Sequence, residues 1–349
     1  MVESAKAGSE NKQTQKLRRK PAGAALILSL GMVLLLIMLF FSISFGAADV
    51  DLKMVWQAVF HYDSSITNHQ IIQEVRLPRA LASVMIGAFL AVSGAIMQGM
   101  TRNPLASPSI MGVTDGAAFA MAVALAFFPS TSYLGFMFWA FAGAGLGAGM
   151  VFSAGAFARG GMTSVKLALA GVAVGTLLHA LSSIIAIHFR VAQDLTFWYA
   201  GGLAGTQWLS VKIIIPVAIF GFVAAMIISK SVTILSLGEE VSKGLGQKTW
   251  LVKLLGIIIV LALTGAAVSI AGSIGFVGLV IPHITRFLVG MDYRWIIPCS
   301  AILGGLLLTA ADLGARLVNA PYETPAGIIT AVIGVPFFLY LARREGRSL

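Results

Sequence analysis

Residues 24–46 read AALILSLGMVLLLIMLFFSISFG, an uninterrupted run without a charged side chain. About 20 apolar residues in a helix are enough to cross the roughly 30 Å hydrocarbon core of a bilayer. The same character continues to Ala342, with the few charges confined to short breaks. A soluble domain of 349 residues needs more polar surface than 11% charged residues provide. The sequence therefore predicts a polytopic membrane protein.

Apolar runs separated by polar breaks predict an all-α fold with about ten transmembrane helices. The predicted spans are 24–46, 80–100, 108–128, 134–158, 166–188, 209–230, 252–271, 274–290, 295–314 and 325–342. The third and eighth are interrupted by glycine and proline, so their ends are the least sharply defined. We expect one transmembrane domain over residues 22–349, preceded by a disordered basic cytoplasmic tail over residues 1–21. The tail and first run are too long for a cleaved signal.

The distribution of Lys and Arg predicts that both termini are cytoplasmic. With ten spans and the N-terminus inside, 18 of the 24 basic residues lie on the cytoplasmic side. The outer side keeps Lys53, Arg76, Arg79, Arg190, Lys212 and Arg316. This is the positive-inside bias of membrane proteins. It accounts for the net charge of +10 without nucleic acid, whose binding would gather basic residues on one face.

Side chains that could carry chemistry are few and scattered. Cys299 is the only cysteine, which excludes an intrachain disulfide and a Cys-based metal site. His179 and His188 share one predicted span but fall on opposite helix faces, so they cannot chelate one metal ion. A phosphate-binding G-x-x-x-x-G-K-[ST] loop is missing from the sequence. We therefore expect no cofactor, metal site or enzymatic activity, and any energy for transport must come from another chain or an ion gradient.

Two carboxylates of the 14, Asp115 and Asp312, fall within predicted spans, and both lie toward span ends. A carboxylate at the membrane centre is the usual mark of a proton or sodium pathway. The sequence predicts no carboxylate at the membrane centre.

Two breaks place arginines on the predicted outer face. The string Arg76-Leu77-Pro78-Arg79 precedes the second span, and Arg316 follows the ninth. We expect these three side chains to be exposed cations on a surface otherwise poor in them. Anchoring to lipid headgroups is the alternative interpretation.

The longest internal cytoplasmic break, 231–250, contains the string LGEEVSKGLG over 237–246. Gly238 can cap a short helix, and Glu239 and Glu240 suit its positive N-terminal end. Gly244 and Gly246 can end it. A short helix between two spans has the form of a docking element, and a solvated loop is the alternative.

Two further patterns bear on architecture. LAVSGA at 90–95 matches LALTGA at 261–266, an offset of 171 residues. These segments lie in spans of opposite direction, which indicates an inverted internal repeat. Small residues spaced by four, as in Gly145, Gly149 and Ser153 or Gly171 and Gly175, predict close helix packing.

Taken in order, the breaks resemble the FecCD-type transmembrane permease subunits of ABC importers for iron siderophores, cobalamin and haem. The matching strings are RLPR (76–79), GAFLAVSGAIMQ (87–98), RNPLASPSIMGVTDGA (102–117), LALAGVAVG (167–175), LGEEVSKGLG (237–246), GSIGFVGLVIPHITRFLVG (272–290), ADLGARL (311–317) and ETPAGIITAVIGVPFFLYL (323–341). Together they cover nearly the whole chain after Ala24.

The resemblance implies a multi-pass subunit of a bacterial cell membrane that forms the translocation path with a second permease subunit. Two ATP-binding subunits would attach inside, an extracytoplasmic binding protein would dock outside, and lipid would surround the complex. The implied docking residues are Arg76, Arg79 and Arg316. The implied coupling helix covers about 236–248, with Gly238, Glu239, Glu240 and Gly244. By position, Thr163 and Ser164 correspond to a cytoplasmic gate.

On family frequency, the implied substrate is a ferric siderophore, which travels as a chelate and needs no protein ligands for the iron. The main alternative is an ion-coupled secondary transporter, which also often has inverted repeats. A membrane-embedded enzyme is a third possibility, but it would need a polar constellation that five scattered histidines do not supply.

Overall fold

The computed structural model describes residues 21–46, 50–156, 164–320 and 322–345, and every regular element in these ranges is helical. The tail predicted for residues 1–21 lies, apart from Pro21, outside the described residues. The elements are α2 (Pro21–Ser44), α3 (Leu52–Phe60), α4 (Thr67–Ile71), the π-helical η1 (Ile72–Arg76), α5 (Leu77–Thr101), the 3₁₀ turn η2 (Pro108–Met111), α6 (Val113–Phe127), α7 (Tyr133–Ala156), α8 (Ser164–His188), α9 (Ala192–Ala200), α10 (Trp208–Ser236), α11 (Glu239–Gly244), α12 (Thr249–Ala271), α13 (Val277–Val289), α14 (Tyr293–Val318) and α15 (Ala326–Glu345).

Seven segments of the described chain are long and apolar enough to cross a bilayer. They are Pro21–Ser44, Thr67–Thr101, Tyr133–Gly155, Lys166–His188, Trp208–Ser236, Thr249–Ala271 and Tyr293–Val318. Three shorter apolar helices are Val113–Phe127, Val277–Val289 and Ala326–Leu341. Each of the ten predicted apolar runs overlaps one of these segments, although Thr67–Thr101 begins 13 residues before the predicted run 80–100.

Helices α6 and α13 are short because the backbone before each is irregular. Gly112 precedes α6 with φ 71°, and Phe276 precedes α13 with φ 66°. With 15 and 13 residues, these helices span only about 22 and 20 Å at 1.5 Å per residue. Irregular backbone at such positions is tolerated in membranes where it is covered by protein or lines a cavity.

The predicted break at 76–79 is helical in the structure. Helices α4, η1 and α5 form one continuous segment, Thr67–Thr101. Pro78 lies in the first turn of α5, where its missing N–H costs little. The wider π turn immediately before it joins α4 to α5 without a loop.

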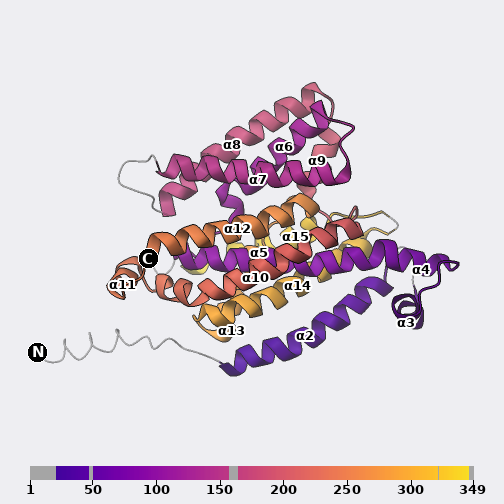
Figure 1. The fold of residues 1–349 in the computed structure, drawn as a ribbon, viewed down its shortest axis with the longest axis horizontal. Helices are drawn as coiled ribbons and strands as arrows, with labels where there is room; N and C mark the ends of the chain where they lie inside the picture. Colours follow the sequence, from indigo (N-terminus) through magenta and orange to yellow (C-terminus); the bar gives the residue numbers. More distant parts are fainter. Residues whose placement is uncertain (1–20, 47–49, 157–163, 321, 346–349) are drawn as a thin grey trace, which may run out of the picture.

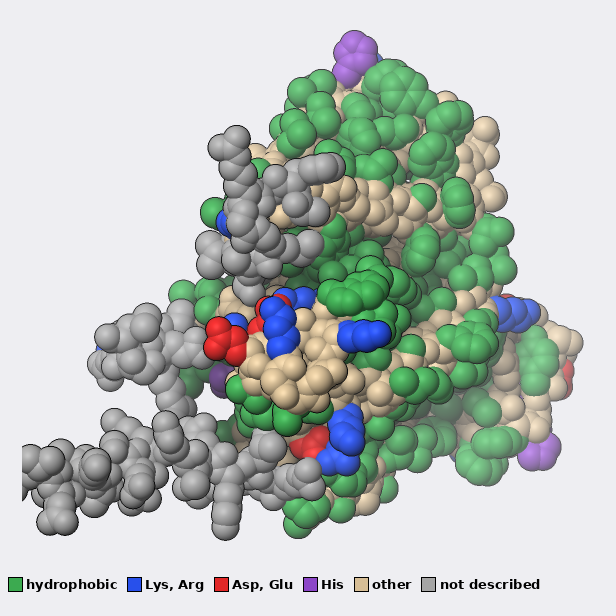
Figure 2. All heavy atoms as spheres, turned by 60° about the vertical axis from the view of Figure 1, so that its left-hand side comes forward, with side chains coloured by type: hydrophobic (Ala, Val, Ile, Leu, Met, Phe, Trp, Pro, Cys, Tyr) green, Lys and Arg blue, Asp and Glu red, His purple; other side chains and the backbone are tan. Residues whose placement is uncertain are grey.

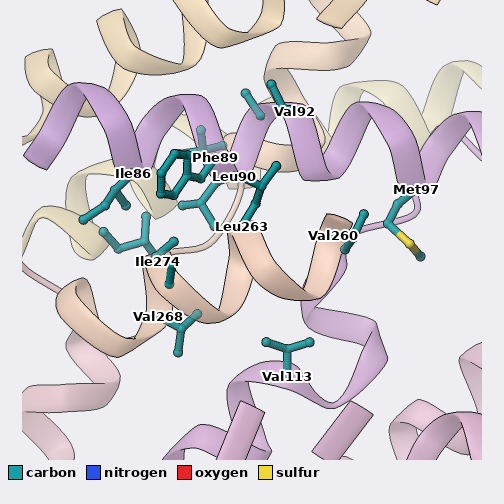
Figure 3. Close-up of a cluster of buried hydrophobic side chains, with 14 of the residues drawn as sticks. Ile86, Phe89, Leu90, Val92, Met97, Val113, Val260, Leu263, Val268 and Ile274 are labelled. Atoms are coloured by element: carbon teal, nitrogen blue, oxygen red, sulfur yellow. The ribbon is translucent and has the colours of Figure 1, made fainter. Parts of the chain in front are cut away.

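Helix α5 forms the centre of the bundle, and glycines allow its neighbours to approach closely. Figure 3 shows Phe89 and Leu90 of α5 beside Leu263 of α12. A Cβ atom at Gly94 would overlap the carbonyl group of Gly278 in α13. The prediction of small-residue packing is wrong for Gly145 and Gly149, since nothing lies within 4 Å of a Cβ built there.

The helices run broadly along one direction (Figure 1). Helices α6, α7, α8 and α9 form a group on one side of α12 and α5, and α2 lies on the other side. Helix α11 lies at one end of the bundle, and α3 and α4 lie at the opposite end. Functional groups at the ends of the bundle are therefore separated by its whole length.

Candidate functional site

The three arginines expected at the outer surface are buried. Arg76 is 7% exposed, Arg79 5% and Arg316 7%. The expectation that they stand as exposed cations is therefore wrong, and the reason is that the fold supplies each with partners from distant parts of the chain.

Arg79 and Arg316 share one buried carboxylate. Nη2 of Arg79 donates to Oδ1 of Asp312 at 2.9 Å, and its Nε lies 3.1 Å from both carboxylate oxygens. Asp312 is fully buried, and its Oδ2 lies 3.3 Å from Nη2 of Arg316, one turn along α14. The outermost member is Glu323, whose half-exposed carboxylate accepts from Nη1 of Arg79 at 2.8 Å. We call these four residues and Arg76 the outer arginine cluster.

The cluster also caps the end of α2. Nη1 of Arg76 donates to the carbonyls of Ile43 and Ser44, both at 2.7 Å. Arg316 donates to the carbonyl of Ser42 at 2.9 Å and to its hydroxyl at 2.7 Å. The last carbonyls of a helix have no partner within it, and a cation there also complements the helix dipole. The arginines therefore tie together the ends of α2, α5 and α14.

Sequence reasoning missed this cluster because its members are far apart in the chain. Asp312 follows Arg79 by 233 residues, and the α2 carbonyls precede Arg316 by more than 270. The available signal was local: Asp312 and Arg316 have i,i+4 spacing in an otherwise apolar helix, which is a typical ion-pair spacing.

At the opposite end, the predicted short helix is present as α11. It begins after Gly238, which has φ 136°, and Gly246 follows it with φ 77°. Glycine suits both positions because other residues rarely adopt such angles. The helix is shorter than the expected 236–248, since Ser236 still belongs to α10 and α12 begins at Thr249.

Ion pairs hold α11 against α12. The Glu239 carboxylate accepts from Nζ of Lys253 at 2.7 Å and lies 3.2 Å from Nζ of Lys243. The hydrogen bond from Lys253 is the main reason that the pKa of Glu239 lies below its ordinary value. The buried hydroxyl of Ser242 bonds the side chain of Gln247, which in turn donates to the Ser231 carbonyl at 3.2 Å. These bonds fix the orientation of α11.

Helix α11 and its flanks present both apolar and charged side chains. Leu237, Val241, Leu245 and Trp250 are all exposed. Figure 2 shows basic and acidic side chains gathered at this end of the molecule, next to hydrophobic ones. Apolar side chains exposed beside charges are typical of a protein interface.

The structure describes only one of the two predicted gate residues. Thr163 lies outside the described residues. Ser164 is the first residue of α8, and its role stays a prediction.

A polar group lies deeper in the bundle than the sequence predicts. Asp115 belongs to the first turn of α6, and a Cβ at Gly175 would lie 2.6 Å from its Oδ2. Gly175 is near the middle of α8, whose 25 residues span about 37 Å. His179 follows one turn later, with its Nδ1 3.1 Å from the Tyr199 hydroxyl of α9. Asp115 lies toward the end of its own helix, as expected, but beside the middle of α8, because α6 begins only after the irregular segment 102–112.

Comparisons with known proteins agree on one class. The sequence model of the FecCD transport family matches residues 34–344. The chain is 61% identical over 327 residues to the iron(3+)-hydroxamate import system permease protein FhuB of Bacillus subtilis (strain 168), covering 94% of this chain and 85% of that one. It is 41% identical over 300 residues to the cobalamin import system permease protein BtuC of Halobacterium salinarum, covering 85% and 80%.

A solved structure is similar over nearly the whole chain. It is described as a metal-chelate type ABC transporter in an inward-facing conformation. The TM-score is 0.80 at 31% identity, covering 91% of this chain and 99% of that one. The helices described above therefore have the arrangement of an ABC permease.

Proposed function

The chain belongs to the FecCD transport family, and we propose that it forms the translocation path for a ferric siderophore of the hydroxamate type. The chain is a non-catalytic, multi-pass permease subunit of an ABC importer in the cell membrane. The observation that carries the substrate assignment is the 61% identity, over 94% of this chain, to a permease whose name specifies iron(3+)-hydroxamate import. ATP hydrolysis then belongs to a partner subunit.

We propose ten membrane helices, cytoplasmic termini and an inverted repeat of five helices each. The order long, short, long in α5 to α7 recurs in α12 to α14. The offset of 171 residues carries α5 onto residues 248–272, and α12 occupies Thr249–Ala271. The positive-inside bias supports the orientation. The domain limits, 1–21 for the tail and 22–349 for the permease, belong to the same proposal.

Helix α11 is the proposed docking element for an ATP-binding subunit. Gly238, Glu239, Glu240 and Gly244 define it, and its exposed apolar side chains lie beside charges. Since Glu239 is tied to Lys253 of α12, a displacement of α11 is passed directly to a long membrane helix. A second permease subunit, of the same or a sibling chain, completes the proposed path.

We propose that a substrate-binding protein docks at the end of the bundle that holds the outer arginine cluster. Buried guanidinium groups support an indirect role for Arg76, Arg79 and Arg316, in which they hold the surface in shape. The member of the outer arginine cluster most accessible to a partner is Glu323, with 48% of its side chain exposed.

The second candidate is an ion-coupled secondary transporter, and one observation favours it. The depth of Asp115 beside Gly175 is what such a transporter needs. Family membership favours the ABC permease.

Purification of the tagged chain in mild detergent, with identification of co-eluting proteins, tests the proposal. We expect an ATP-binding subunit to co-elute in stoichiometric amount, and the Glu239→Lys/Glu240→Lys variant to lose it without losing membrane insertion. Purification of the wild type as a single chain that transports without ATP would contradict the proposal.

A further inference from the structure

Three polar side chains from three helices meet near the middle of the bundle's length. Asp115 comes from α6, His179 from α8 and Tyr199 from α9. The His179 and Tyr199 rings are in edge-on contact at 5.4 Å between centroids, and Nδ1 of His179 lies 3.1 Å from the Tyr199 hydroxyl. Gly175, one turn before His179, leaves the space that the Asp115 carboxylate occupies. We call these three side chains the midspan polar group.

The N-terminal position of Asp115 in α6 explains only part of this arrangement. A carboxylate in the first turn of a helix is stabilised by the helix dipole. That effect does not involve His179 or Tyr199, which belong to other helices. Among the residues that the structure describes, His179 is the basic side chain that faces the Asp115 carboxylate.

His179 is exposed on the surface of this chain. Thr176 and Ser183 lie on the same edge of α8, within about 60° of His179 at about 100° per residue. Leu177, Leu181 and Ile184 occupy the other part of the exposed surface. Ionisable side chains at membrane depth face protein or a water-filled cavity because contact with lipid is costly. The polar edge of α8 therefore does not face acyl chains in the assembled protein.

We propose that the polar edge of α8 lines the translocation path and that His179 and Tyr199 contact the passing metal chelate. This inference rests on the proposed transport of a ferric hydroxamate. A hydroxamate chelate presents oxygen atoms around the iron, and these accept hydrogen bonds. When the Tyr199 hydroxyl donates to Nδ1, the His179 proton is on Nε2. Nε2 is then the donor to the chelate, and Asp115 is a positioning residue.

The single native cysteine makes a labelling test possible. Cys299 is fully buried, so the wild type provides the background. In the assembled importer in membrane vesicles, His179→Cys is treated with a membrane-impermeant, charged thiol reagent. Ile184→Cys is the matched control, since Ile184 is exposed on the same helix but lies about 140° away around its axis.

We expect His179→Cys to react, and binding protein loaded with ferric hydroxamate to slow the reaction, whereas Ile184→Cys does not react. An unreactive His179→Cys, or one whose labelling the loaded binding protein does not change, would overturn the proposal. Uptake by the wild type is measured in the same vesicles. Its absence would refute the proposed function instead, so the two failures are distinguishable.

Transport by substituted proteins gives a second, independent measurement. We expect His179→Ala to lower uptake roughly tenfold, because it removes one hydrogen bond to the chelate. His179→Gln should retain part of the uptake, because its amide can still donate a hydrogen bond. Asp115→Asn should lower uptake alone but add little in the His179→Ala background, because coupled residues are not additive. Additive losses, or full uptake by His179→Ala, would show that the midspan polar group only packs the helices together.

Discussion

Removal of the buried carboxylate Asp312 should be among the most destabilising single changes in this chain. Asp312→Ala leaves two buried guanidinium groups, those of Arg79 and Arg316, without their shared partner. Removing one partner of a buried ion pair typically costs about 3–5 kcal/mol. Glu323 still neutralises Arg79, so the lower end of this range applies. We therefore expect a loss of about 3 kcal/mol, or a fall in Tm of roughly 6 °C or more.

The assay is thermal melting of the purified chain in detergent, without partner subunits. Glu323→Gln is the matched control, because it removes a half-exposed partner of the same arginine, worth about 1 kcal/mol or less. Asp312→Asn should fall between the two, since it keeps hydrogen-bond acceptors but loses the charge. If Asp312→Ala melts no lower than Glu323→Gln, the outer arginine cluster does not hold the helix ends together and the reasoning is refuted.

Three further predictions use the same purified chain. Gly94→Ala should abolish folded yield in size-exclusion chromatography because its Cβ would overlap the backbone of α13, whereas Gly145→Ala, with open space around it, should be neutral; equal yields would contradict the packing. The pKa of Glu239 is lowered, so its ion pair with Lys253 stabilises the fold at pH values above the ordinary carboxyl pKa, and this stabilisation is lost on acidification. The Tm should therefore fall more steeply below about pH 4 in the wild type than in Lys253→Met. Parallel plots of Tm against pH would argue against the ion pair. Arg316→Glu should lower the Tm without any binding protein, whereas direct docking predicts an unchanged Tm and weaker association.

The positions of the membrane helices could be predicted from the sequence because they depend on composition and length. A long apolar run such as 24–46 has few stable conformations in lipid other than a helix. The same holds for α11, whose ends are set by local glycine geometry at Gly238 and Gly246.

Contacts between distant segments could not be predicted in the same way. Hydropathy assigned Arg79 to a break, but Asp312 and Glu323 neutralise it inside a helix end. The depth of Asp115 depends on how far the irregular segment 102–112 enters the bundle, which no single-sequence pattern measures. In both cases the error concerned the surroundings of a charged group, since those depend on tertiary packing.

Radiolabelled ferric hydroxamate uptake into proteoliposomes tests the central claim most directly. The vesicles contain the chain with its co-purified partners, and the loaded binding protein is added on the outer side. We predict uptake that requires ATP inside the vesicles and the binding protein outside, and that persists when an uncoupler abolishes ion gradients. Uptake without ATP that the uncoupler stops would contradict the ABC permease function and identify an ion-coupled transporter.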